Sequence, residues 1–155
     1  MNRKRYAFIS FVAILAVFVG NAFAAPPTPT IEFVARGTVG HLDAKNSGVE
    51  VERERGSADH VVAQITFPPG SQIGWHQHPG VVLVTVGSGK LQVLHEDCER
   101  EVFGAGDSFY EQGDVHLARN RGEVDTVIYA TWIIPTKTPA DGLTIPADTP
   151  EGCNA

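Results

Sequence analysis

Short apolar runs, several of them alternating with polar residues, follow one another along the chain after residue 58. The runs HVVAQITF (60–67), VVLVTV (81–86) and KLQVLH (90–95) are rich in β-branched residues, and Gly, Pro, Asp and Asn separate such runs. Runs of this kind, bounded by turn-forming residues, are typical of β-strands. No stretch of this region has the period of a convincing amphipathic helix. The pattern therefore predicts an all-β domain.

The same pattern sets the expected domain organisation. The runs CEREVF, DSFYE, VHLARN and VDTVIYATWII continue the series at a spacing typical of a β-sandwich or barrel. We expect the barrel over residues 59–135, preceded over 25–58 by an N-terminal segment with the first strand or strands. Residues 136–155, which contain Pro146 and Pro150, are expected to form an irregular C-terminal tail.

Residues 1–24 follow a different pattern. A basic start, RKR, precedes an almost wholly apolar run over residues 7–20, and Ala-Phe-Ala ending at Ala24 has the small-residue spacing of a cleavage site. This layout is typical of a secretory signal peptide. A membrane anchor is the alternative, but the apolar run is shorter than the roughly 20 residues that span a bilayer. We therefore expect a periplasmic or secreted protein, with no membrane insertion after cleavage.

Removal of the signal peptide would also change the charge. The full chain of 155 residues has 12 Lys and Arg against 18 Asp and Glu, a net charge of −6 at pH 7. Three basic residues would leave with the signal, which gives the mature chain a net charge of −9. A surface of this sign repels nucleic acid, so we exclude nucleic acid as a partner.

Cys98 and Cys153 are the two cysteines of the chain. In an exported domain, two cysteines indicate most simply one disulfide. Two free thiols remain the alternative. Metal ligation by these residues is less favoured, because no third Cys or neighbouring His stands at zinc-site spacing around either one.

His76 and His78 stand one residue apart in the extended stretch IGWHQH. Because side chains alternate along a strand, both imidazoles would point to one side and Gln77 to the other. Neutral imidazoles are good ligands for Zn, Fe, Ni and Cu, so two of them on one face can chelate an ion. The pair therefore marks a candidate metal site.

The residues around this pair form a wider pattern. Gly70 and five further residues precede His76, then His78 follows, and Gly89 stands eleven residues later. This stretch resembles the first half of the cupin signature, which runs Gly, five residues, His, one residue, His, and then a Glu and a further Gly. Together with a second stretch, GDVHLARN, the resemblance covers residues 59–134.

The second half of the cupin signature ends Pro-x-Gly, two residues, His, three residues, Asn. Gly113, His116 and Asn120 match it. Glu111 stands where Pro is usual, and Gly106 opens this half one residue closer than usual. Both halves at the right separation indicate the family fold, a small jelly-roll β-barrel.

The resemblance implies one divalent metal ion inside the barrel, with Fe, Zn, Mn and Ni as candidates. Carried over by position, its ligands are His76, His78 and His116, whereas Val82 occupies the place of the signature Glu. Three imidazoles leave the ion with a charge of +2, which is costly in a low-dielectric interior and should recruit an anion. We therefore expect a small anionic or chelating molecule as the ligand.

Three kinds of function are compatible with such a site. A metal-dependent enzyme, for example of the dioxygenase type, would use the coordination positions that three His leave open for substrate and dioxygen. A zinc form would instead lower the pKa of a bound water. A non-catalytic module would bind the metal or a small ligand, and a structural or interaction protein would keep the barrel only as a packed core.

Several other residues are weaker candidates. Glu111 could reach inward as a hydrogen-bond partner of a ligand or as a proton-transfer group. Gln72 is an even number of residues from His76 and His78, so in a regular strand its side chain would point to the same side, and it is a further inward candidate. We interpret three further His residues as exposed or capped: His41, His60 and His95. Three aromatic residues are interpreted as core residues that could also line a pocket: Tyr110, Tyr129 and Trp132.

The segment IEFVARG, residues 31–37, reads as an edge strand or a swapped strand. An exposed strand edge is a liability that a partner strand can cover, and cupins often pair through an edge of the barrel. We therefore expect a homodimer.

Overall fold

The computed structural model describes residues 25–40, 43–52 and 56–153. Within this part of the chain there are twelve strands and one short 3₁₀ helix. The expected signal peptide (1–24) and His41 lie outside the described residues. The described residues include no helix that is long and apolar enough to cross a membrane.

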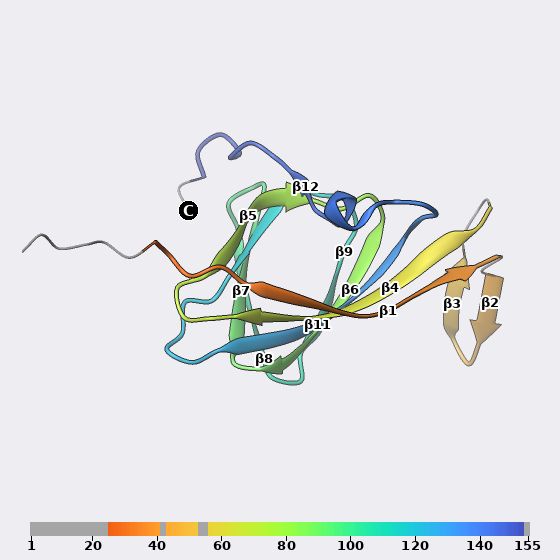
Figure 1. The fold of residues 1–155 in the computed structure, drawn as a ribbon, viewed down its shortest axis with the longest axis horizontal. Helices are drawn as coiled ribbons and strands as arrows, with labels where there is room; N and C mark the ends of the chain where they lie inside the picture. The colour runs from red at the N-terminus through yellow and green to blue at the C-terminus, as the bar shows by residue number, and fades with distance from the viewer. Residues whose placement is uncertain (1–24, 41–42, 53–55, 154–155) are drawn as a thin grey trace, which may run out of the picture.

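Two five-stranded antiparallel sheets form the barrel (Figure 1). The first sheet has the strand order β1-β4-β11-β6-β9 and the second has the order β12-β5-β10-β7-β8. The strands of the first sheet are β1 (Thr30–Val39), β4 (Ala58–Phe67), β6 (Val81–Ser88), β9 (Ser108–Glu111) and β11 (Thr126–Pro135). Those of the second are β5 (Gln72–Gln77), β7 (Lys90–His95), β8 (Arg100–Gly104), β10 (His116–Arg119) and β12 (Ile145–Pro146). The predicted all-β barrel is confirmed.

A separate two-stranded hairpin of β2 (Asp43–Asn46) and β3 (Val49–Glu52) lies at one end of the molecule, away from the two sheets (Figure 1). A turn at Asn46-Ser47-Gly48 connects its strands, and Ser47 and Gly48 both have positive φ. Positive φ at both central residues is what a tight hairpin turn requires.

The space between the two sheets is filled by alternate side chains of the strands. In β4 and β6 every second residue is buried, including Phe67 of β4 and Val84 of β6, whereas Leu83, which directly precedes Val84, is exposed. Leu91 and Val93 of β7 meet these residues from the second sheet. Each fully buried side chain of this size contributes about 1.5–3 kcal/mol by leaving water.

Two residues of the cupin-like pattern have structural roles away from the His residues. Gly89 has φ +75°, and a Cβ there would lie 2.6 Å from Thr126 Oγ1 and 2.7 Å from the Asp125 carbonyl oxygen, so only glycine fits. Asn120 is buried, and its side-chain amide donates to the carbonyls of Phe67 (2.8 Å) and Val124 (2.7 Å). These contacts hold the ends of strands together around the barrel.

The C-terminal tail is more regular than expected. It forms the 3₁₀ turn η1 (Ala140–Leu143) and the two-residue strand β12, which pairs with the end of β5. The Ala147 amide also donates to the Trp75 carbonyl at 2.9 Å. The expected disulfide is confirmed: Cys98, in the turn after β7, is bonded to Cys153 with a Cα–Cα distance of 5.2 Å. The tail is thus anchored against the second sheet.

Candidate metal centre

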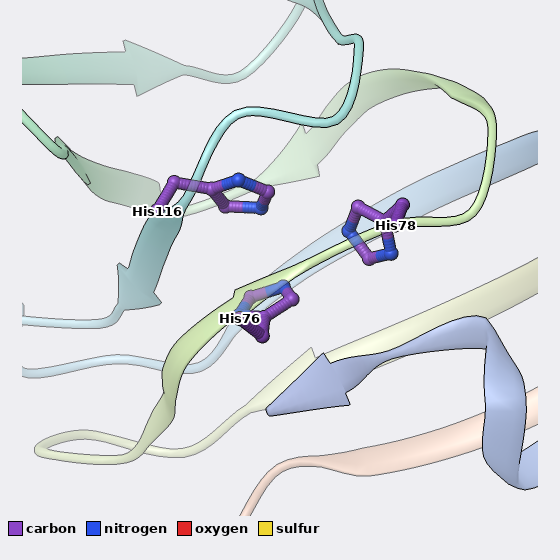
Figure 2. Close-up of side chains that lie close together, drawn as sticks. All are labelled: His76, His78 and His116. Atoms are coloured by element: carbon purple, nitrogen blue, oxygen red, sulfur yellow. The ribbon is translucent and has the colours of Figure 1, made fainter. Parts of the chain in front are cut away.

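The three predicted His residues come together inside the barrel (Figure 2). His76 is on β5, His78 directly follows this strand, and His116 begins the neighbouring antiparallel strand β10, in register with His76. The ring centroids are 4.3–5.2 Å apart, and one ring nitrogen from each residue lies within 4.8 Å of the other two. All three residues are buried, with His116 only 1% exposed.

The proton on each imidazole is fixed by the backbone. In each of the three rings Nδ1 lies within hydrogen-bond distance of a main-chain carbonyl, which can only accept, so Nδ1 carries the hydrogen. The opposite nitrogen, Nε2, then keeps its lone pair, as a metal ligand requires. The acceptors are the carbonyls of Gly74 (2.7 Å from His76), Leu143 (2.6 Å from His78) and Asp114 (2.9 Å from His116).

A carboxylate lies beside these nitrogens. Glu111 Oε2 is 3.1 Å from His78 Nε2, and Glu111 Oε1 is 3.2 Å from His116 Nε2. The Glu111 side chain ends strand β9, is buried, and stands directly opposite Val82 in the β6–β9 pair. Glu111 therefore faces inward, which is the orientation that made it a candidate in the sequence. Val82, at the place of the signature Glu, brings no carboxylate to the three imidazoles, but Glu111 places one beside two of them.

Glu111 is ionised in this environment. Burial raises the pKa of its carboxyl, but the facing rings of His116 and His78 outweigh burial and lower the pKa to about 2. Burial likewise lowers the pKa of His116, but contact with Glu111 outweighs it, and the pKa is raised. For His76, burial and then the neighbouring His116 lower the pKa to about 4, so this ring is neutral at pH 7.

This donor set fits a divalent metal ion. Among the described residues, no partner in hydrogen-bond geometry meets His116 Nε2, although this atom is buried and Glu111 is near. With Nδ1 donating in every ring, the three rings each keep one nitrogen lone pair, and the acceptor-only carboxylate of Glu111 lies beside Nε2 of His78 and of His116. Acceptors held at such distances need a cation between them, either a proton on a ring or a metal ion. Three imidazoles with a carboxylate suit first-row divalent metals.

The cavity beside the site is small and mostly apolar. Its volume is about 30 Å³, and His76, His78 and Glu111 line it together with the apolar interior of the barrel. A buried water occupies roughly 10–15 Å³ on this measure, so the cavity has room for two or three water-sized groups. Trp132, expected as core or pocket lining, is buried and contributes to this wall.

The weaker candidates lie elsewhere. Gln72 is exposed, so its predicted inward orientation is wrong. Among the aromatic residues, Tyr110 and Tyr129 are 64% and 47% exposed and are not core residues. His60 is exposed, as expected, and His95 lies outside the site, with Nε2 2.9 Å from Glu101 Oε2.

One contributor to the site had no sequence signal. The Leu143 carbonyl that fixes the His78 ring comes from η1, 65 residues further along the chain. Glu111 did have a signal, since an acidic residue stands where the signature has Pro. The backbone acceptor had none, because any residue at position 143 offers the same carbonyl.

Comparisons with known proteins agree with this architecture. Residues 63–134 match the sequence model of the Cupin_2 family, described as a cupin domain. A Klebsiella pneumoniae protein with a double-stranded β-helix domain has a similar structure, with a TM-score of 0.51 and 21% identity, over 75% of this chain and 84% of that one. A Cupin 2 conserved barrel protein of Salinispora arenicola gives a TM-score of 0.44 and 26% identity, over 47% and 61% of the two chains. A cupin domain from Bordetella pertussis gives a TM-score of 0.43 and 22% identity, over 63% of this chain and 98% of that one. No curated protein matches the sequence.

Proposed function

Because the chain belongs to the cupin superfamily, we propose that it is an exported metal-dependent enzyme that holds one divalent ion on His76, His78 and His116. The observation that carries this proposal is the convergence of three buried imidazoles, each of which has Nδ1 within hydrogen-bond distance of a backbone carbonyl. Iron, manganese or nickel would supply open coordination positions for substrate and dioxygen, and zinc an acidified water.

The substrate class follows from charge and space. Glu111 reduces the charge of a divalent site from +2 to +1, and this remaining charge still favours an anionic group over a neutral one of equal size. The cavity of about 30 Å³ admits only a small reactive end, of the size of a carboxylate or a diatomic molecule. We therefore propose a small anionic or chelating substrate in an oxygenase-type reaction.

The protein residues have defined tasks in this reaction. The three His hold the ion and, through their fixed Nδ1 protons, keep its ligands in one orientation. The apolar wall formed by residues such as Val84 and Trp132 excludes bulk water and strengthens electrostatic attraction to an anionic group.

The metal assignment is tested with two His variants. The protein is purified anaerobically, and bound metal per chain and the melting temperature with and without a chelator are measured for wild type, H116A and H60A. His60 is the matched control because it is an exposed His on β4. We expect stoichiometric metal and a chelator-sensitive melting temperature in wild type and H60A only, since binding to the folded state stabilises it. Equal metal content in wild type and H116A would overturn the assignment.

The catalytic part is tested by oxygen uptake with small carboxylates, diketones, thiols and aromatic diols. Turnover of a small anion that is lost in H116A supports the enzyme. The second candidate is a non-catalytic module that binds the metal or a small ligand, and the small volume of the cavity favours it. Stoichiometric metal without turnover of any compound would favour this module.

Export and assembly are further parts of the proposal. The Cys98–Cys153 disulfide supports a periplasmic or secreted location, because disulfides persist in oxidising compartments. The homodimer is supported by β1, an edge strand on which Ile31, Phe33 and Val34 are exposed. Cell fractionation tests the first, and the molar mass in solution of the chain without residues 1–24 tests the second.

A further inference from the structure

We propose that Glu111 is the fourth protein ligand of the metal ion, supplying from strand β9 the carboxylate that the cupin signature places on β6. This inference rests on the proposed function, namely that the three His hold a metal. It adds a ligand from a position at which the signature has Pro.

The register between β6 and β9 places Glu111 on the same face as residue 82. Val82 of β6 and Glu111 of β9 are direct partners in an antiparallel pair. Side chains that are directly opposite in such a pair lie on the same face, with Cβ atoms about 4.5–5.5 Å apart. Val82 faces the barrel interior and is 1% exposed, and Glu111 faces the same interior, whereas the preceding Tyr110 faces solvent. A carboxylate on residue 111 therefore enters the same space as one on residue 82.

The distances carry the second step. The two Glu111 oxygens lie 3.1 Å from His78 Nε2 and 3.2 Å from His116 Nε2. Two ligand atoms bound to one ion at about 2.1 Å are separated by about 3.0 Å at a right angle and about 3.4 Å at the tetrahedral angle. The observed spacings are those of neighbouring ligands on a shared ion.

The hydrogen-bond pattern carries the third step. An alternative role for Glu111 is to accept a hydrogen bond from a protonated His116. In the described part of the chain, however, His116 Nε2 has no partner in hydrogen-bond geometry, so its N–H direction does not point at the carboxylate. The Nδ1 atom of the same ring is already directed at the Asp114 carbonyl, at 2.9 Å. His116 Nε2 and the carboxylate are therefore close, at 3.2 Å, without being in hydrogen-bond geometry, as expected for two ligands of one ion.

The test compares metal binding by wild type, E111Q, the double variant V82E/E111Q and the control E101Q. E111Q keeps the size of the side chain and removes its charge, and the double variant returns the carboxylate to the position of the signature. E101Q removes an exposed carboxylate of β8 that pairs with His95, outside the site. Affinity for Co²⁺ and Mn²⁺ is measured by competition with a chromophoric chelator, and the visible spectrum of the Co²⁺ forms reports the ligand set.

We expect E111Q to lose about 100-fold or more in affinity, beyond the 10–100-fold typical of losing a partner behind a ligand, with a changed Co²⁺ spectrum. V82E/E111Q should recover part of both, and E101Q should match wild type. An E111Q spectrum and affinity equal to those of wild type would overturn the inference while leaving the three-His site intact. Absence of metal binding in wild type would instead refute the proposed function.

A second measurement covers the case in which E111Q does not fold, as judged by circular dichroism. Wild-type crystals loaded with Mn²⁺ locate the ion by anomalous scattering. An Mn–Oε distance to Glu111 of about 2.0–2.2 Å supports direct ligation. A water between the ion and Glu111 would overturn it.

Discussion

The disulfide between Cys98 and Cys153 should contribute a large part of the stability of this barrel. It closes a loop with a sequence separation of 55 residues. The loop-closure entropy that such a cross-link removes from the unfolded chain corresponds to about 4 kcal/mol at 25 °C. The perturbation is the variant C98A/C153A, which removes the cross-link and leaves small apolar side chains where Cys153 is buried.

Equilibrium unfolding in urea measures this contribution. With an m-value of about 2 kcal/mol/M, a loss of about 4 kcal/mol lowers the midpoint by about 2 M. Reduction of the metal-free wild type should reproduce the loss, and the same reductant should leave C98A/C153A unchanged. Equal free energies of unfolding for the oxidised and reduced wild type would refute the reasoning.

The same variant has a consequence at the metal centre. The disulfide anchors the end of the tail whose η1 turn provides the Leu143 carbonyl to His78 Nδ1, at 2.6 Å. Loosening the tail should weaken this hydrogen bond. Loss of a hydrogen-bond partner behind a metal-binding His typically lowers metal affinity by about 10–100-fold. We therefore expect C98A/C153A to bind metal more weakly, by about tenfold, even under conditions in which it is fully folded. Unchanged affinity would show that β12 alone holds the tail in place.

Other substitutions test the fold. G89A should destabilise the protein by more than about 1 kcal/mol, because Gly89 has positive φ and no room for a Cβ, whereas G37A, in open space, should not; thermal melting compares them. F67A should cost about 3–5 kcal/mol in urea unfolding, since Phe67 is fully buried. A hydrogen bond from Arg36 lowers the pKa of Asp59, so this pair stabilises the fold above about pH 3.9 and loses its effect as the pH falls through the lower folded-state pKa. R36M should therefore unfold at a higher pH than wild type during acid titration, and an unchanged midpoint would contradict this.

The barrel could be predicted from the sequence because its signal is local. Alternation in β4 and β6 marks the inner face directly, and the His76–His78 spacing puts both rings on one side. His116 is far from this pair in the chain, and only the resemblance to the cupin signature connected them. The strand register then brings His116 opposite His76.

The alternation of inward and outward side chains predicts the wrong face for Gln72, because strand β5 is irregular. Strict alternation predicts that Gln72 shares the face of His76, but β5 has three steps between Ile73 and His76 against two steps between their partners on β10. This extra residue is a β-bulge, which reverses the facing of all residues before it. Gln72 is therefore exposed, while the same bulge brings the Gly74 carbonyl to His76 Nδ1.

The facing of Glu111 could not be predicted for a different reason. Its facing depends on the pairing of β6 with β9, and strands so distant in sequence have no register that the sequence alone reveals. Once the register is known, residue 111 is the neighbour of residue 82, and the missing acidic side chain is found one strand away.

The burial of His76, His78, His116 and Glu111, none of them more than 8% exposed, bears on how the protein would acquire its ion. Because the residues around such an ion are this deeply buried, we expect its release to be limited by local opening of the barrel, so that the release rate follows local unfolding. We expect loaded protein to release metal to excess chelator over hours at 25 °C and far faster near its melting temperature. The identity of the ion would then be decided by which metal is present while the chain folds, and not by later competition among metals.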